Sequence, residues 1–164
     1  KISKNSKRVT DKLPINFKYI GLIKILFPKS KVIHCIRNPK DNCFSIYKNY
    51  FTSQKMNFAY NLDEICKYYN FYSDLMKHWK LALPNFVYDV SYEDLVKNPK
   101  NVIKLLLKEC NLDWNDACLK FYENKRSVKT VSDVQVRKKM YTSSINSWKS
   151  YKKNIELKFK KYKI

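Results

Sequence analysis

Glycine is almost absent from this chain, since Gly21 is the single glycine in 164 residues. A phosphate-binding loop of the form GxxxxGK[ST] needs two glycines, so these residues do not contain the loop of a P-loop kinase. Long apolar runs are missing too. No stretch reaches the roughly 18 uninterrupted apolar residues of a membrane span. The first ten residues also lack the apolar core of a signal peptide.

Paired cysteine motifs are likewise missing. The five cysteines are odd in number, and no two of them form a CxxC pair. This pattern argues against a disulfide framework and against a zinc site, so we predict no metal. Most of the cysteines occupy apolar positions, which predicts buried free thiols and favours a reducing compartment.

Arginine is scarce although the chain is strongly basic. It supplies 4 of the 34 basic residues, lysine supplies the rest, and the net charge is +20. A nucleic-acid interface would concentrate arginine and expose aromatic side chains for stacking. The lysines are instead dispersed, so we predict no nucleic-acid partner. A basic nucleic-acid-binding module remains the alternative class, and steeply salt-dependent DNA binding would support it.

The chain length suits one domain, and its elements alternate in type, which predicts an α/β layered fold. The apolar run 17–27 predicts a buried helix that ends at Pro28. Residues 31–36 (KVIHCI) and 86–90 predict two short strands. Further helices are expected over 39–51, 62–83, 98–110, 113–121 and 142–152, with a loop over 123–141 and a strand over 8–11.

The segment from Arg37 to Ser45 joins a strand to a capped helix. Asn38 can cap the helix, Pro39 suits its first position, and Asp41 complements its first turn. Ligands bind where parallel strands end, and the helix start offers free N–H groups. Arg37 could grip a phosphate with its fork while Ser45 donates a hydroxyl. The equally weighted alternative is that Arg37 caps another helix and Ser45 is an unused surface residue.

Four motifs occur in a meaningful order along the chain. They are TDKLPINF at 10–17, RNPKD at 37–41, VSYEDLV at 90–96 and YTSSINSWKSY at 141–151. Together they resemble the 3′-phosphoadenosine 5′-phosphosulfate (PAPS)-dependent sulfotransferase family, most closely its tyrosylprotein and tetratricopeptide-linked bacterial branch. The resemblance implies a three-layer, P-loop-NTPase-like α/β fold with a mostly parallel sheet. Residues 1–164 would form the C-terminal portion of one sulfotransferase domain, and we expect its first strand and donor loop upstream.

The resemblance also implies an activity. Such an enzyme transfers a sulfuryl group from PAPS to a hydroxyl acceptor and leaves 3′-phosphoadenosine 5′-phosphate (PAP), without a metal. By family position, Arg37 and Ser45 would bind the 3′-phosphate. Tyr92 would lie near the adenine and that phosphate, and its alternative is a half-buried aromatic at a strand end.

The C-terminal motifs resemble a segment that closes over the cofactor. Arg137, Trp148 and Lys149 are its candidate binding residues. Trp148 could instead close the core. The family pattern SxGRW is altered here, because Asn146 and Ser147 replace its glycine and arginine; Lys149 or Lys152 is expected to substitute for that arginine.

Sulfuryl transfer needs a cation near the bridging oxygen of the leaving nucleotide. Lys12 is the candidate from its family position, and its alternative is a solvated lysine. Ser132 is a second candidate, for the sulfate or the 5′-phosphate. No side chain has a convincing claim as the general base, although Asp11 and Glu93 are local alternatives.

The acceptor stays open among peptide tyrosine, carbohydrate and small hydroxyl compounds. For assembly we allow a homodimer. The expected location is the cytoplasm, or the Golgi lumen for a eukaryotic enzyme of the tyrosylprotein type. The remaining alternative function is a degenerate, non-catalytic sulfotransferase-like domain.

Overall fold

The computed structural model describes residues 8–51, 54–124 and 136–164. Two parallel strands, β1 (Val32–Ile36) and β2 (Val87–Ser91), form its sheet. The α-helices are α1 (Ile20–Leu26), α2 (Pro39–Tyr47), α3 (Leu62–Ala82), α4 (Tyr92–Lys97), α5 (Pro99–Glu109) and α7 (Lys152–Lys161). Short 3₁₀ helices are η1 (Pro14–Tyr19), η2 (Gln54–Tyr60), η3 (Asp116–Cys118), η4 (Phe121–Glu123) and η5 (Ser147–Tyr151).

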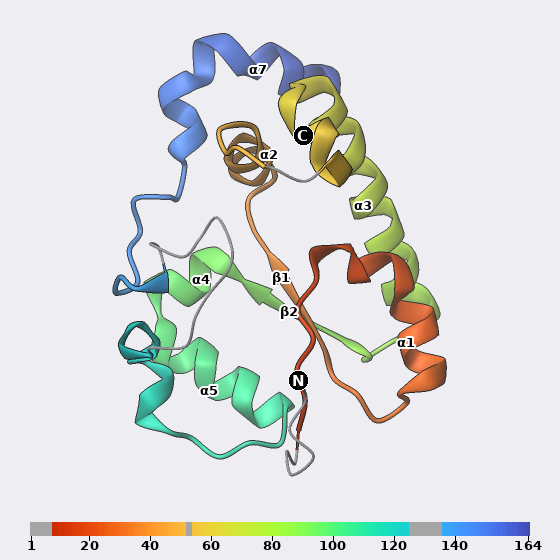
Figure 1. Cartoon of the computed structure of the whole chain (residues 1–164), viewed down its shortest axis with the longest axis vertical. Coiled ribbons are helices and arrows are strands. Elements are labelled where there is room, and N and C mark those ends of the chain that lie inside the picture. Colours follow the sequence, from red (N-terminus) through yellow and green to blue (C-terminus); the bar gives the residue numbers. More distant parts are fainter. Residues whose placement is uncertain (1–7, 52–53, 125–135) are drawn as a thin grey trace.

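The elements form layers around the sheet, which confirms the α/β class. Figure 1 shows α1 and α3 on one side of the strands and α4 and α5 on the other. Helix α2 continues from the end of β1, and α7 crosses the top of the molecule beside α2 and α3. The register pairs Val32 with Val87 and Ile36 with Ser91, so both strands end at the same edge.

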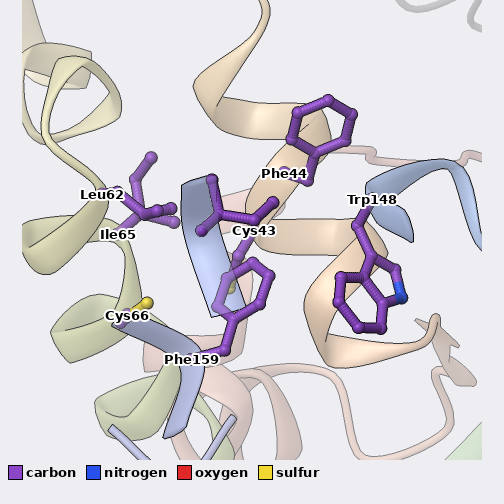
Figure 2. Packing of buried hydrophobic residues seen from close by; sticks show 8 residues of the cluster. Cys43, Phe44, Leu62, Ile65, Cys66, Trp148 and Phe159 are labelled. Carbon is purple, nitrogen blue, oxygen red and sulfur yellow. The ribbon is translucent and has the colours of Figure 1, made fainter. Parts of the chain in front are cut away.

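Two hydrophobic clusters hold these layers together. The first joins α2, α3 and α7, and its buried members include Cys43, Ile65, Cys66 and Phe159. Figure 2 shows these side chains converging, with the Trp148 ring at the edge of the group. The second cluster joins α1 and α3 to the sheet around Ile20, Met76 and Phe86. Because α7 supplies Phe159, the end of the chain is part of the core.

Helix α1 differs from its prediction. The run 17–27 was expected to be a buried helix, but it divides into η1 and α1, and Ile20 is the single fully buried residue of α1. Leu22, Ile25 and Phe27 are exposed. The reason is that one side of α1 packs on α3 and β2, while its other side meets no described element.

Several other boundaries were wrong. Residues 8–11 form no strand; there Arg8 donates to the carbonyls of Cys110 and Asn111 at the end of α5. Helix α2 stops at Tyr47, where the Asn49 amide bonds to the Ile46 carbonyl and the Asn49 side chain donates to the Ser45 carbonyl. The region 113–121 holds 3₁₀ turns, and the last helix runs from 152 to 161. Residues 92–97, where no helix was expected, form α4.

The cysteines agree with the prediction in part. All five are free thiols, but only Cys43 and Cys66 are buried, and Cys35 is exposed. Cys35 is exposed because it lies on strand β1 at a position that no described helix covers.

Gly21 allows α1 to approach α3 closely. A Cβ atom added at Gly21 would lie 2.9 Å from both Cη2 and Cζ3 of Trp79. The Trp79 ring cannot retreat easily, since its Nε1 donates to the carbonyl of Phe17 at 2.7 Å. The absence of a side chain at position 21 therefore sets the spacing of these two helices.

We expect Gly21→Ala to destabilise the chain. Overpacking costs about 1–3 kcal/mol and outweighs the gain of about 1 kcal/mol in helix propensity. Urea unfolding measures the difference. Leu22→Ala, on the exposed side of the same helix, is the control and should change stability by less than about 0.5 kcal/mol. Equal stability of wild type and Gly21→Ala would contradict the close packing.

A carboxylate on α3 holds α7 in place. Asp63 accepts hydrogen bonds from Lys158 and Lys161. The bond from Lys158 is the largest cause that lowers the pKa of Asp63 to about 2. Because the folded-state pKa is depressed, this contribution is complete above the ordinary value of about 3.9 and is lost as the pH falls toward 2.

We therefore expect α7 to loosen between about pH 4 and pH 2, a window set by the pKa of Asp63. Amide-exchange protection of α7 across this range measures the effect. In Asp63→Asn the protection should be lower at pH 6 and should not respond to pH in this window. Identical profiles for the two proteins would show that Asp63 does not hold α7.

Candidate functional site

The parallel register brings two predicted site residues together. Ile36 and Ser91 are partners at the ends of the strands, so Arg37 and Tyr92 follow side by side. The Arg37 Cζ lies 4.8 Å from the centroid of the Tyr92 ring. This stacking of a guanidinium on an aromatic face stabilises both side chains and orients the plane of the arginine. The two chain segments are also linked by the Asn38 amide, which donates to Glu93 Oε1 at 2.8 Å.

The start of α2 is not an open anion site. The Asn38 Oδ1 accepts from the amides of Lys40 and Asp41, at 3.1 and 3.2 Å. Pro39 has no N–H to offer, and the Asn42 amide bonds to the Asn38 carbonyl. The predicted cap is thereby confirmed, but the expectation of free N–H groups was wrong. Recognition of an anion here depends on side chains.

Arg37 has unused donor capacity. Its Nη2 donates to the carbonyl of Ser144 at 2.6 Å, whereas its Nε is buried and has no acceptor among the described residues. Within those residues no carboxylate forms an ion pair with Arg37. A buried N–H without a partner costs about 1–3 kcal/mol, so an anion that accepted from Nε would be stabilised.

Asp41 is the residue whose contacts the sequence analysis missed. We expected it to complement the helix dipole, but its side chain is fully buried. Its Oδ2 accepts from the Asn146 amide at 2.6 Å, and its Oδ1 accepts from the Trp148 amide and the Ser147 hydroxyl, both at 3.1 Å. Asp41 lies three residues before the apolar Phe44 and therefore on the same helix face. This position is the sequence signal that could have indicated a buried carboxylate with a partner.

We call residues 144–148 the closing segment. In Figure 1 the chain before α7 passes from beside α4 to beside α2, which carries the closing segment across the junction of β1 and α2. Asn146 has a φ of 60°. Asparagine tolerates this left-handed conformation better than most residues, which explains why it can stand at the position of the family's glycine.

Ser45 lies on the same face of α2 as Asp41, because the two are four residues apart. It is half-buried, and its hydroxyl forms no hydrogen bond with any described residue. Its carbonyl accepts from the Asn49 side chain at 2.6 Å. The Ser45 hydroxyl is thus without a described partner, further along α2 from the corner where β1, α2 and α4 meet.

The remaining predicted site residues lie elsewhere or in the core. Trp148 is 7% exposed and packs edge-to-face on Phe159, which matches the core alternative for this residue. Lys12, Arg137 and Lys149 are exposed. Ser132 lies outside the described residues. Their roles in binding or catalysis stay predictions.

The two local candidates for the base are both engaged. Asp11 Oδ2 accepts from Asn16 Nδ2 at 2.7 Å, so its partner is this asparagine. Glu93 accepts a hydrogen bond from the Asn38 amide, as described above.

A polar network crosses the sheet beneath α3. His34 and Asp89 are register partners, and their Nδ1 and Oδ1 atoms are 2.7 Å apart. His34 Nε2 contacts the Tyr72 hydroxyl, and Lys80 contacts Asp89. Burial raises the pKa of Tyr72 to about 12. Partial burial would raise the pKa of Asp89, but hydrogen bonds from Lys80 and His34 outweigh it and lower that pKa. The network satisfies polar groups inside the fold, and two polar residues at the centres of parallel strands were its signal.

Comparison with known proteins identifies the family. The family model described as "Sulfotransferase family" matches residues 1–116, well over half of the chain. The chain therefore belongs to the sulfotransferase family. An uncharacterized protein of Aquifex aeolicus (strain VF5) is 41% identical over 155 residues. That alignment covers 93% of this chain and 20% of the relative, so the chain spans about a fifth of the relative's length.

The part of the chain that the structure describes lacks two further features. None of the described helices combines the length and the apolar character that a membrane crossing requires. Within the same ranges, no group of three or more His, Cys, Asp or Glu side chains could hold a metal ion.

The cap on α2 yields a two-sided prediction. Asn38→Ala should cost about 1 kcal/mol of stability, the usual loss for an N-cap. It should also free the Lys40 and Asp41 amides, so inorganic phosphate should raise the melting temperature of the variant more than that of wild type. Asn61→Ala, which removes the matching cap of α3, should lose similar stability without gaining a phosphate response, because the carboxylates of Asp63 and Glu64 in the first turn of α3 repel an anion. An equal phosphate response in both variants would contradict the assignment.

Proposed function

We propose that this chain carries the 3′-phosphate-binding part of a sulfotransferase that uses PAPS as its donor. The observation that carries the proposal is the Arg37 side chain. Its guanidinium is stacked on Tyr92, has no carboxylate partner among the described residues, and keeps a buried Nε–H without an acceptor. These are the properties of an arginine that awaits an anion.

The corner has a chemistry that fits a phosphate monoester. A phosphate can accept from Nε and also from the Ser45 hydroxyl, which has no described partner. The positive end of α2 adds a favourable field even though its amides are capped. The part of the Tyr92 ring that Arg37 does not cover would meet the attached nucleoside.

The reaction would transfer a sulfuryl group to a hydroxyl. The bond between the acceptor oxygen and sulfur forms, the bond between sulfur and the bridging phosphate oxygen breaks, and PAP leaves while the acceptor proton passes to a base. Within this chain, Arg37 and Ser45 would bind and orient the donor, and Lys12 would stabilise the charge on the leaving oxygen. Lys12 is exposed, which suits a group that meets its partner only in the complex.

The acceptor would be a compound with a hydroxyl group, and peptide tyrosine, carbohydrate and small alcohols or phenols are all compatible with the proposal. Ser132, Arg137 and Lys149 are further candidates for donor contacts, together with Trp148 if its ring edge meets the adenine. The family assignment favours an enzyme over a nucleic-acid-binding module.

Calorimetric titration of the native protein with PAP tests the proposal. Arg37→Ala should weaken PAP binding by about 2–3 kcal/mol, or roughly 30- to 150-fold, because a charged hydrogen-bonded pair loses one partner. Arg37→Lys keeps the charge but loses the fork, so it should fall between these two proteins. Arg8→Ala is the matched control and should bind PAP like wild type, since Arg8 caps α5. Unchanged affinity in Arg37→Ala would overturn the proposal.

A further inference from the structure

We propose that Asp41 is a positioning residue for phosphate recognition: it fixes the closing segment on α2, so that the segment encloses the 3′-phosphate against Arg37. The proposal rests on the proposed function of Arg37, and it assigns a role to a residue that touches neither the donor nor the acceptor. It starts from the fact that Asp41 is the single charged side chain recorded as buried among the described residues.

The contacts of Asp41 are all directed to one segment. Two backbone amides and one hydroxyl, all from residues 146–148, bind its two carboxylate oxygens at 2.6 to 3.1 Å. A left-handed residue lets nearby amides point toward one anion, as in the anion-binding turns called nests. Asn146 supplies this conformation with its φ of 60°. Here the anion is a carboxylate of the protein itself, and it ties the segment to the first turn of α2.

The same segment reaches Arg37. Two residues before Asn146, the Ser144 carbonyl accepts from Arg37 Nη2 at 2.6 Å. Because residues 146–148 are anchored on Asp41, they determine where Ser144, at the other end of the closing segment, meets the Arg37 guanidinium. Arg37 Nε is buried in this arrangement, so a phosphate reaches it only when part of its surroundings moves aside; the Ser144 end is bonded to the same guanidinium. We infer that residues 146–148 stay anchored on Asp41 during this movement and return Ser144 to cover the bound phosphate.

Asp41 also keeps its charge away from the arginine. Arg37 and Asp41 are only four residues apart and have opposite charges, yet no ion pair between them is present in the described chain. The donors of the closing segment satisfy the carboxylate instead. Without them, Asp41 would be free to pair with Arg37 and would compete with the phosphate. One set of hydrogen bonds thus both positions the segment and keeps Arg37 available for the ligand.

The test measures the preference of the native protein for the 3′-phosphate. The preference is the ratio of the Kd for adenosine 5′-phosphate to the Kd for PAP, which differ in that phosphate. Asp41→Asn turns one acceptor oxygen into a donor that opposes the amide of either 146 or 148, and we expect the ratio to fall about tenfold or more. Most of the fall should appear as faster dissociation of PAP. Asp94→Asn removes a first-turn carboxylate of α4 whose side chain has no described contact, and should keep the wild-type ratio.

A second pair of variants leaves Asp41 intact. Asn146→Val disfavours the left-handed φ and should reduce the ratio, whereas Asn146→Gly accepts this φ and should preserve it. If Asp41→Asn does not fold, these two variants test instead whether the anchored closing segment sets the preference for the 3′-phosphate.

The outcomes separate the two proposals. If wild type shows no preference for PAP, the phosphate site itself is wrong, and the role of Asp41 is wrong with it. If wild type prefers PAP and Arg37→Ala removes the preference, but Asp41→Asn and Asn146→Val weaken both nucleotides equally, then Asp41 is only a structural residue and this inference is overturned. A selective loss of the 3′-phosphate preference in these variants supports it.

Discussion

The parallel pairing of β1 with β2 is the constraint on which the rest of the site depends. Its register ends both strands at one edge, with Ile36 opposite Ser91. Arg37 and Tyr92 are the next residues of the two chains, where β1 leads into α2 and β2 leads into α4. The register therefore places them side by side, and their side chains stack. A shift of the register by one residue would turn the side chains of one strand to the opposite face and separate the pair.

Charge pairing supports the proposal that this edge binds an anion. Most carboxylates that form ion pairs in the described chain pair with lysines on or near the surface, such as Asp63 with Lys158 and Glu109 with Lys31. Arg37 is outside this pattern, and so is Asp41, which is satisfied by backbone amides. The corner therefore holds a guanidinium whose charge no described carboxylate balances. The Asn38 cap occupies the backbone amides at the start of α2. The side chains of Arg37 and Ser45 therefore remain as the hydrogen-bond donors for a ligand in the proposed site.

Local patterns predicted much of this arrangement. Asn38 caps α2 as its sequence context indicated, and the β-branched run 31–36 holds a strand. The family resemblance placed Arg37 and Tyr92 near the same phosphate; the stacking between them was not predicted, and it has a physical basis in the register. These features depend on neighbours within a few residues, or on the ends of strands, and sequence patterns report such features well.

Long-range contacts were not predictable in the same way. Asp41 meets residues more than a hundred positions away, and those partners are mainly backbone amides, which every residue has. The exposed face of α1 is as apolar as the faces of a buried helix. The sequence pattern therefore could not show that no described element packs on that face. Trp148 was left open between a nucleotide and the core because an aromatic side chain suits both. Its contact with Phe159 depends on α7, and the last helix had been predicted too early in the chain, over 142–152.

The most direct test of the central claim observes the Arg37 Nε–H itself. Its NMR resonance can be assigned by comparison with Arg37→Lys and followed during titration with PAP and with adenosine 5′-phosphate. We expect PAP to move this resonance strongly downfield, as the Nε–H gains a charged acceptor, and we expect adenosine 5′-phosphate to leave it nearly unchanged. An Nε–H resonance that responds equally to both nucleotides, or to neither, would contradict the account.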